Sequence, residues 1–351
     1  MENLIYHSIA DIYKISDKDK LSFWQVVLKR EAYEQGISEE EVFSKMRRLY
    51  LVMKEADKNY DGKLRSESGM SGGDGLKFEQ YDNARSLFSP FSNKVCERAL
   101  KMGENNACMK RIVAAPTAGS CGVIPAIMIT AEECLNLSED DIVKALFVAA
   151  GIGNVIAENA SISGARGGCQ AEIGSASAMA AGALFFLKMK LEKRNSDNNE
   201  IADIEIANEK LSKEDLFRAD FLKELGIGNA VAFALSNMLG LTCDPVGGLV
   251  EVPCIKRNAS GAVNAILAAE LASAGIKSVI SADDVIDSMR RIGDSMHPDL
   301  KETAMGGLAT TESAQKALKK IRAKRYLTRN FKSDIFSFNI ERGSSNHLVR
   351  W

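Results

Sequence analysis

The feature that most restricts the fold is a set of helix-start signals, each followed by apolar residues at helical spacing. Ser-x-x-acidic patterns begin at Ser38, Ser138 and Ser281, and a serine in this position caps the first turn of a helix. After each pattern, apolar residues recur every three or four positions, as one buried helix face requires. Strand-like alternation is scarce, whereas Ala-rich segments such as 262–275 suit closely packed helices. The sequence therefore predicts an all-α fold, a single large helical domain with Gly-rich active-site loops.

The composition and charge fit a globular protein with a small ligand. The chain has 351 residues, of which 46% are hydrophobic and 26% charged, enough to bury a substantial core. A formal net charge of -2 gives no electrostatic reason to expect nucleic acid. The longest apolar stretch, 177–191, is shorter than a membrane span of about 20 residues, and the N-terminus lacks the pattern of a signal peptide. We expect a cytoplasmic protein that binds neither nucleic acid nor a membrane.

Changes in composition divide the chain into regions. We expect an N-terminal helical region at 1–65, a central domain at 66–317 and a basic tail at 318–351. Charge and Asn dominate 188–215, which we interpret as a solvated, partly helical insertion at the edge of the central domain. The tail carries nine Lys or Arg against two Asp or Glu, so it is either a partly disordered terminus or a segment that docks on an acidic partner.

Five polar breaks rich in glycine separate the predicted helices. Glycine permits positive φ and lets backbone N–H groups approach a ligand, so binding loops favour it. We expect these breaks to form one composite site. They are residues 68–75, 115–122, 161–170, 242–248 and 304–311.

The seven cysteines point toward metal chemistry more than toward disulfides. An odd number of cysteines without a secretion signal disfavours a disulfide framework. Cys243 and Cys254 are spaced more widely than the ligands of most structural zinc sites, but Pro245 and a Gly-Gly pair between them allow the chain to double back. Cys169 lies in a similar Gly-rich setting. Three thiols in such turns suit an iron–sulfur cluster, and buried inert cysteines remain the alternative.

Four segments carry a resemblance to a known family. They include the runs ISGARGGCQAEIG and LTCDPVGGLVEVPC. Their order along the chain, from about residue 66 to 310, is similar to the catalytic alpha region of the iron–sulfur L-serine dehydratases (L-serine ammonia-lyases). The resemblance implies a fold of the serine dehydratase alpha-chain type. The segments are residues 115–126, 159–182, 240–265 and 301–309.

The resemblance also implies the chemistry. Cys169, Cys243 and Cys254 match the three cysteines that hold a 4Fe–4S cluster in this family, where one iron is left open to substrate. As a Lewis acid, that iron would help hydroxide to leave L-serine, and the product 2-aminoacrylate would hydrolyse to pyruvate and ammonia. Pyridoxal phosphate is not needed in this scheme.

The family resemblance extends to a partner. Family members often carry a beta region with a Ser-His-Thr–Gly-Pro motif that helps complete the active site, and this chain lacks that motif. We therefore expect an alpha subunit that works with a separate beta subunit, in an oligomer. A divergent stand-alone relative is the alternative.

The Gly-rich loops also hold candidate substrate-binding and catalytic residues. Asp74 is a candidate for the substrate ammonium group, although it also suits a helix N-cap. Lys256 and Arg257 would anchor a carboxylate or balance cluster charge, unless they line a solvated loop. Hydroxyl and backbone N–H groups beside glycine would bind the carboxylate or take part in catalysis, although such hydroxyls often just close a turn. These candidates are Thr117, Ser120, Ser161, Ser163, Gly119, Gly122 and Gly164.

The sequence identifies no general base. His297 stands before a proline at a predicted helix end, where a structural or exposed histidine is more common. Cys121 lies in a predicted active-site loop and is interpreted as a small packing residue. Cys96, Cys108 and Cys134 are interpreted as inert thiols of the helical core.

Three other functions stay open from the sequence. A cysteine desulfidase would use the same open iron to expel sulfide. A non-catalytic cluster-binding subunit would keep the cluster without turnover. A structural zinc protein would bind a single metal ion through its thiols.

Overall fold

The computed structural model describes residues 4–81, 85–203 and 213–331, and these ranges are helical. Their one β-type pairing is an isolated bridge between Cys243 and Lys301. The predicted all-α fold is therefore confirmed. The α-helices are α1 (Ile9–Asp19), α2 (Phe23–Gln35), α3 (Glu39–Lys58), α4 (Asp74–Glu79), α5 (Pro90–Ala107), α6 (Val123–Cys134), α7 (Glu139–Asn159), α8 (Gly164–Gly167), α9 (Ser175–Asp203), α10 (Lys213–Glu224), α11 (Gly226–Ser236), α12 (Cys254–Ser273), α13 (Ala282–Ser295) and α14 (Glu312–Phe331). Short π or 3-10 turns are η3 (Gln170–Gly174), η4 (Val246–Gly248), η5 (Pro298–Leu300) and η6 (Gly307–Thr310).

The three predicted helix starts are correct, and each is capped as the sequence indicates. The serine Oγ accepts a hydrogen bond from the backbone N–H three residues on, at 3.1 Å for Ser38, 3.2 Å for Ser138 and 3.1 Å for Ser281. Acidic residues occupy the first turn of α3, α7 and α13, where they interact favourably with the helix dipole. Local sequence signals thus fix where these helices begin.

Helix α9 forms the centre of the bundle. Its first part, 175–187, is buried on all sides and packs against α7, α11 and α12. Close packing depends on small residues, since a Cβ on Gly182 would lie only 2.4 Å from Ile152 Cδ1. The apolar stretch noted in the sequence is therefore an interior helix, as all-round hydrophobicity indicates. Within the described ranges, none of the helices has both the length and the apolar character to cross a membrane.

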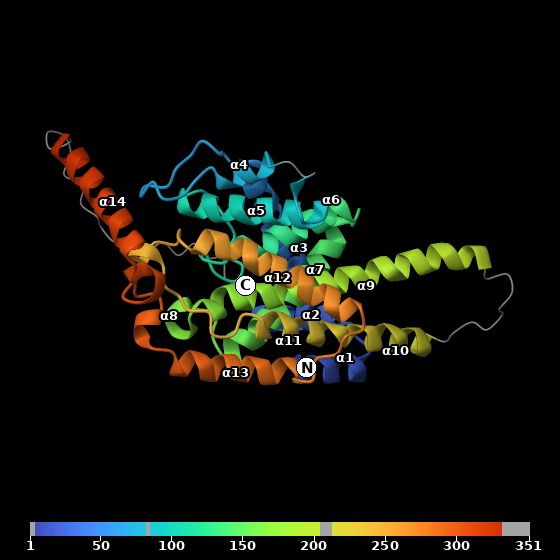
Figure 1. Ribbon diagram of the computed structural model, residues 1–351. Helices are drawn as coiled ribbons and strands as arrows, with labels where there is room; N and C mark the ends of the chain where they lie inside the picture. Colours follow the sequence, from blue (N-terminus) through green and yellow to red (C-terminus); the bar gives the residue numbers. More distant parts are fainter. Residues whose placement is uncertain (1–3, 82–84, 204–212, 332–351) are drawn as a thin grey trace.

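The helices are stacked in layers. Figure 1 shows α5 on one side of α12, with α11 and then α13 on the other, and these neighbours are in contact. The buried residues of α1, α2 and α3 belong to the same hydrophobic core as the central helices. The bundle is thus continuous from the N-terminal region into the centre.

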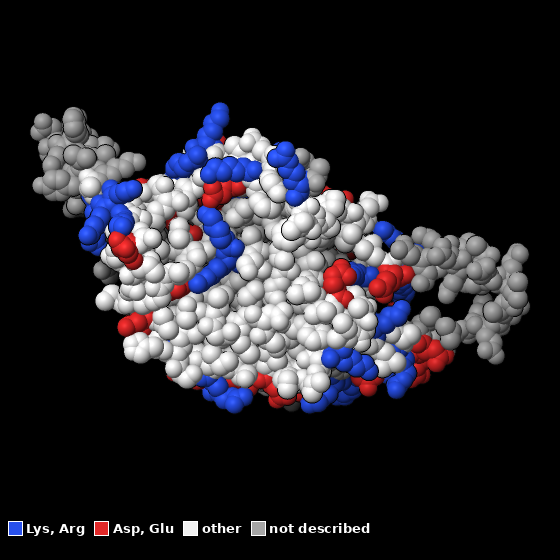
Figure 2. All heavy atoms as spheres, in the orientation of Figure 1, with Lys and Arg blue, Asp and Glu red and all other residues white. Residues whose placement is uncertain are grey.

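Helices α9, α10 and α14 extend away from this bundle (Figure 1). Helix α9 continues to Asp203, and together with α10 it extends beyond the stacked layers (Figure 1). The predicted charged insertion thus begins where α9 leaves the bundle, and its residues 204–212 lie outside the described residues. In the predicted basic tail, α14 reaches Phe331, and 332–351 lie outside the described residues. Figure 2 shows Lys and Arg near α4 and along the α13 side, with little charge across the middle of this face.

Candidate active site

The segment 240–258 doubles back as its sequence predicts. Val246 N donates to Val252 O at 2.8 Å, which closes a loop around η4. Gly247 and Gly248 have φ of 66° and 70°, a left-handed conformation that glycine adopts without steric cost. The loop places Cys243 on its entering arm and Cys254 at the start of α12.

A buried amide ties loop 115–122 to this segment. Asn258 is 1% exposed. Its Oδ1 accepts from Gly122 N at 2.8 Å, and its Nδ2 donates to Gly119 O at 2.8 Å and to Cys254 O at 2.9 Å. The N–H of Gly122, a predicted donor, is therefore already bonded to protein. One side chain thus satisfies three backbone groups and fixes the loop against α12.

A second buried amide ties loop 161–170 to the same segment. Gln170 N donates to Leu241 O at 2.9 Å, and the Gln170 side chain accepts from Gly240 N at 2.9 Å. Its Nε2 donates to Met289 O at 3.0 Å on α13. Because Cys169 directly precedes Gln170, these bonds hold Cys169 beside the arm that carries Cys243.

Two carboxylates bring in the remaining Gly-rich loops. Glu251 Oε2 accepts from Ser66 Oγ at 2.6 Å and from Ser68 Oγ at 2.8 Å, which anchors the stretch leading into loop 68–75. Asp244 Oδ2 accepts from Leu308 N at 2.8 Å, which anchors loop 304–311. The structure thus gathers all five Gly-rich loops around 240–258.

Three buried thiols lie at the centre of this arrangement. Cys169, Cys243 and Cys254 are 2%, 3% and 7% exposed, and all seven cysteines of the chain are free. Burial raises the pKa of Cys169 to about 11 and that of Cys254 to about 12. Burial, Glu172 and the other two thiols together hold the pKa of Cys243 well above its usual range. The three thiols are thus close enough to influence one another electrostatically.

The three thiols fit the ligand set of an iron–sulfur cluster. Thiolates are the usual ligands of such clusters, and each of these sulfurs is buried without a disulfide partner. Among the described residues, no three His, Cys, Asp or Glu side chains are gathered tightly enough to hold a single metal ion. In a cluster, each sulfur can bind a different iron, so the ligands need not converge on one point. That these cysteines bind a cluster stays a prediction.

Arg257 supplies positive charge next to the thiols. Its Nη1 donates to Thr242 O at 2.7 Å, and its Nη2 forms an ion pair of 2.9 Å with Asp244 Oδ1. The Arg257 guanidinium also donates a hydrogen bond to the sulfur of Cys169. Burial alone would lower the pKa of the guanidinium, but Cys169 and Asp244 raise it overall. Of the two roles expected for Arg257, charge balance beside the thiols is the one these contacts support.

Sequence reasoning missed Glu172, which lies where three of the loops meet. A Cβ on Gly119 would lie 2.9 Å from Glu172 Oε2, and a Cβ on Gly164 would lie 3.1 Å from the same atom. Burial raises the pKa of Glu172 to about 7, although a hydrogen bond from Thr117 opposes this shift. The signal in the sequence was an acidic residue three positions after Cys169, inside the run GCQAEIG.

The hydroxyl groups of Thr117, Ser120 and Ser161 bond within their own loops, and Thr117 also donates to Glu172. Thr117 Oγ1 and Ser120 Oγ share a hydrogen bond of 2.9 Å, and Ser161 Oγ accepts from Ser163 N at 3.0 Å. These contacts match the turn-closing alternative. A role toward substrate stays a prediction for all four residues.

Asp74 and Lys256 neutralise each other. Lys256 Nζ lies 2.6 Å from Asp74 Oδ2, and Lys77 Nζ lies 3.0 Å from Asp74 Oδ1. The bond from Lys256 holds the pKa of Asp74 below its usual range. Asp74 is the first residue of α4, and Gly73 is the N-cap. Both predicted substrate contacts thus already have charged partners.

The other cysteines and His297 lie apart from the three thiols or make packing and backbone contacts. Cys121 is buried and its thiol faces a backbone carbonyl, consistent with packing. Cys96 is buried as expected and Cys108 is half-buried, but Cys134 is exposed, so its assignment to the core was wrong. His297 is exposed and its ring accepts a backbone hydrogen bond at the start of η5.

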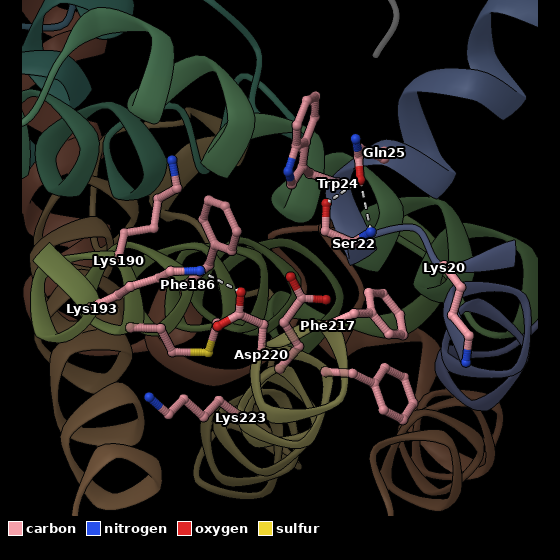
Figure 3. A pocket seen from close by; sticks show the side chains of 13 residues that line it. Lys20, Ser22, Trp24, Gln25, Phe186, Lys190, Lys193, Phe217, Asp220 and Lys223 are labelled. Carbon is pink, nitrogen blue, oxygen red and sulfur yellow. Dashed lines mark hydrogen bonds and ion pairs between the residues drawn. The ribbon is translucent and has the colours of Figure 1, made fainter. Parts of the chain in front are cut away.

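A surface cavity of about 280 Å³ lies elsewhere, between α2, α9 and α10 (Figure 3). Its carboxylates have partners: Glu224 accepts from Phe23 N at 2.8 Å, and Asp220 pairs with Lys193 at 2.6 Å. None of the candidate site residues lines this cavity. The residues that the sequence singled out therefore lie at the thiol site and not at this cavity.

The chain is similar to known proteins over the residues that form this site. The family model described as serine dehydratase alpha chain matches residues 18–201 and 223–309. A probable L-serine dehydratase, alpha chain, of Bacillus subtilis is 38% identical over 319 residues, which are 90% of this chain and 95% of that protein. The L-serine dehydratase, alpha chain, of Peptoniphilus asaccharolyticus is 35% identical over 88% of this chain and 96% of that protein. An L-serine dehydratase of Helicobacter pylori is 40% identical over 216 residues, only 40% of its own length.

Proposed function

The chain belongs to the family of serine dehydratase alpha chains, and on this premise we propose that it is the alpha subunit of an L-serine dehydratase. It would deaminate L-serine to pyruvate and ammonia through 2-aminoacrylate. The observation that supports this proposal most strongly is the meeting of three buried thiols and a partly buried carboxyl group, that of Glu172, at the junction of five Gly-rich loops.

We further propose that Cys169, Cys243 and Cys254 hold a 4Fe–4S cluster. Such a cluster with three protein ligands supplies a Lewis-acidic iron that favours departure of the substrate hydroxyl. Arg257 would offset the negative charge of the thiolates through its contact with Cys169. The buried amides of Asn258 and Gln170 would hold the three sulfurs in fixed positions relative to one another, because each amide ties a cysteine-bearing segment to a neighbouring segment.

The loops would position the rest of the substrate. Thr117 and Ser120 on one loop, and Ser161 and Ser163 on another, stay the proposed hydroxyl donors to the substrate carboxylate. The backbone of these glycine-containing loops would contribute N–H groups. Lys256 would reach the carboxylate only by giving up its ion pair with Asp74. A separate beta subunit is the proposed partner, because relatives of similar length are named as alpha chains.

The test is anaerobic cluster reconstitution followed by a pyruvate assay with L-serine, with and without the beta subunit from the same organism. We expect pyruvate to form from L-serine, and the cluster absorbance to change when L-serine is added. Preferential turnover of L-cysteine would instead identify a desulfidase. An unchanged spectrum and no product, even with the beta subunit, would contradict the proposal.

Matched cysteine variants test the ligand set. Cys169→Ser, Cys243→Ser and Cys254→Ser should each abolish both cluster absorbance and activity. Cys134→Ser is the control, because that thiol is exposed at the end of α6, and it should keep both. Full cluster content in any of the three buried variants would exclude that cysteine as a ligand.

A further inference from the structure

We propose that Glu172 binds the α-ammonium group of the substrate amino acid. This inference rests on the proposed function, because it assigns a role within the same site. It would make Glu172 the residue by which the site distinguishes amino acids from the corresponding hydroxy acids.

The position of Glu172 supports this role. A Cβ on Gly164 would lie 2.9 Å from Cys243 Sγ and 3.1 Å from Glu172 Oε2, so these two atoms are at most about 6 Å apart. On another side, a Cβ on Gly119 would lie 2.9 Å from Oε2 and 3.1 Å from Oε1. The carboxyl group therefore stands between two bare backbone segments, within the reach of a serine-sized molecule from the thiol site.

Among the described residues, no cation pairs with Glu172. Within the described part of the chain, the groups that act on it are Thr117, which donates a hydrogen bond, and Glu302, which is also acidic. The two cations predicted for the site are engaged elsewhere: Arg257 pairs with Asp244 at 2.9 Å, and Lys256 pairs with Asp74 at 2.6 Å. A partly buried carboxylate without a positive partner is unfavourable.

A ligand cation would remove this imbalance. The α-ammonium of an amino acid carries three N–H donors and a positive charge, so it would satisfy the carboxylate by charge-assisted hydrogen bonds. Glu302 adds negative potential at the same place and would repel the substrate carboxylate toward the loops with hydroxyl and N–H donors. Asp74, the residue that the sequence suggested for this role, already has two lysine partners.

The test compares L-serine with 3-hydroxypropionate, which has the hydroxyl and the carboxylate but no ammonium group. Apparent dissociation constants are measured anaerobically from the change in cluster absorbance, which does not require turnover. KM and kcat for L-serine are measured in parallel. In Glu172→Gln, binding of L-serine should weaken about ten- to a hundredfold, while binding of 3-hydroxypropionate stays within about twofold.

Two further variants serve as controls. Glu302→Gln removes one negative charge from the same region and should weaken L-serine binding less than about threefold. Glu172→Asp keeps the charge on a shorter side chain and should recover part of the affinity. This variant also serves as the test if Glu172→Gln folds poorly. If Glu172→Asp, whose carboxylate is one methylene further back, kept the full wild-type preference for L-serine over 3-hydroxypropionate, the proposal would be contradicted.

Several results would overturn the inference while leaving the proposed function intact. Equal weakening of both ligands in Glu172→Gln would show a structural role. Wild-type binding of L-serine combined with loss of kcat would show a role in proton transfer instead. Absence of L-serine turnover by the wild-type alpha and beta subunits together would contradict the proposed function itself. That measurement uses no Glu172 variant, so the two failures can be told apart.

Discussion

Replacing Arg257 by methionine should destabilise the chain strongly, even without any metal. The guanidinium side chain is 16% exposed and the Asp244 side chain 4% exposed, so solvent screens their 2.9 Å ion pair only weakly. Methionine keeps much of the side-chain volume but leaves the buried charge of Asp244 without its positively charged partner, so that the backbone N–H of Leu308 is the contact it retains. It also removes the donor that Thr242 O meets at 2.7 Å.

The expected loss can be worked out from these contacts. Removing one partner of a buried ion pair costs about 3–5 kcal/mol, and we take the lower end, about 3 kcal/mol, because Arg257 keeps some exposure. The lost hydrogen bond to Thr242 O adds about 1 kcal/mol. We therefore expect the free energy of unfolding to fall by about 4 kcal/mol.

Urea unfolding of the metal-free, reduced chain, followed by circular dichroism, measures this loss. The double variant Arg257→Met with Asp244→Asn is the informative control, because the amide removes the uncompensated charge. It should recover about 2 kcal/mol relative to Arg257→Met alone. A single-variant loss below about 1 kcal/mol, or no recovery in the double variant, would refute the view that Arg257 neutralises Asp244.

Two further predictions concern Glu224 and Gly164. Burial raises the pKa of Glu224 to about 7, so the folded state holds this proton more tightly than the unfolded state. The contribution of this group to the free energy of unfolding is therefore fully present below about pH 4.5 and is lost as the pH rises through 7. Glu224→Gln keeps an acceptor for Phe23 N but cannot titrate. The decrease in unfolding free energy from pH 5 to pH 8 should therefore be smaller in this variant than in the wild type, by up to about 3 kcal/mol. An equal decrease in both proteins would contradict the raised pKa of Glu224. Gly164→Ala places a methyl group 2.9 Å from Cys243 Sγ and should reduce the iron retained per chain after reconstitution, together with a loss of about 1–3 kcal/mol in stability; full iron content would show that the loop yields without disturbing the site.

Local signals in the sequence predict the fold well, because helix starts depend on neighbouring residues. Ser38, Ser138 and Ser281 cap their helices as expected. Periodicity is less informative at helix ends, where the buried face is not set by neighbours alone. Cys134, the last residue of α6, was expected in the core and is exposed.

The site is predictable only in part. Glycine and cysteine mark the loops that meet, but the role of each charged residue depends on partners far away in the chain. Lys256 and Arg257 are adjacent in sequence, yet one pairs with Asp74 and the other with Asp244. Glu172 becomes notable only because it is partly buried and because no cation pairs with it in the described part of the chain. Neither property can be read from neighbouring residues.

The anchoring role of 240–258 also determines when the site can form. Loops 115–122 and 161–170 are translated well before the segment that fixes them through Asn258 and Gln170. A nascent chain therefore cannot bring its three thiols together until Cys254 has left the ribosome. The proposed metal centre can thus assemble only after helices α1 to α11 have been translated.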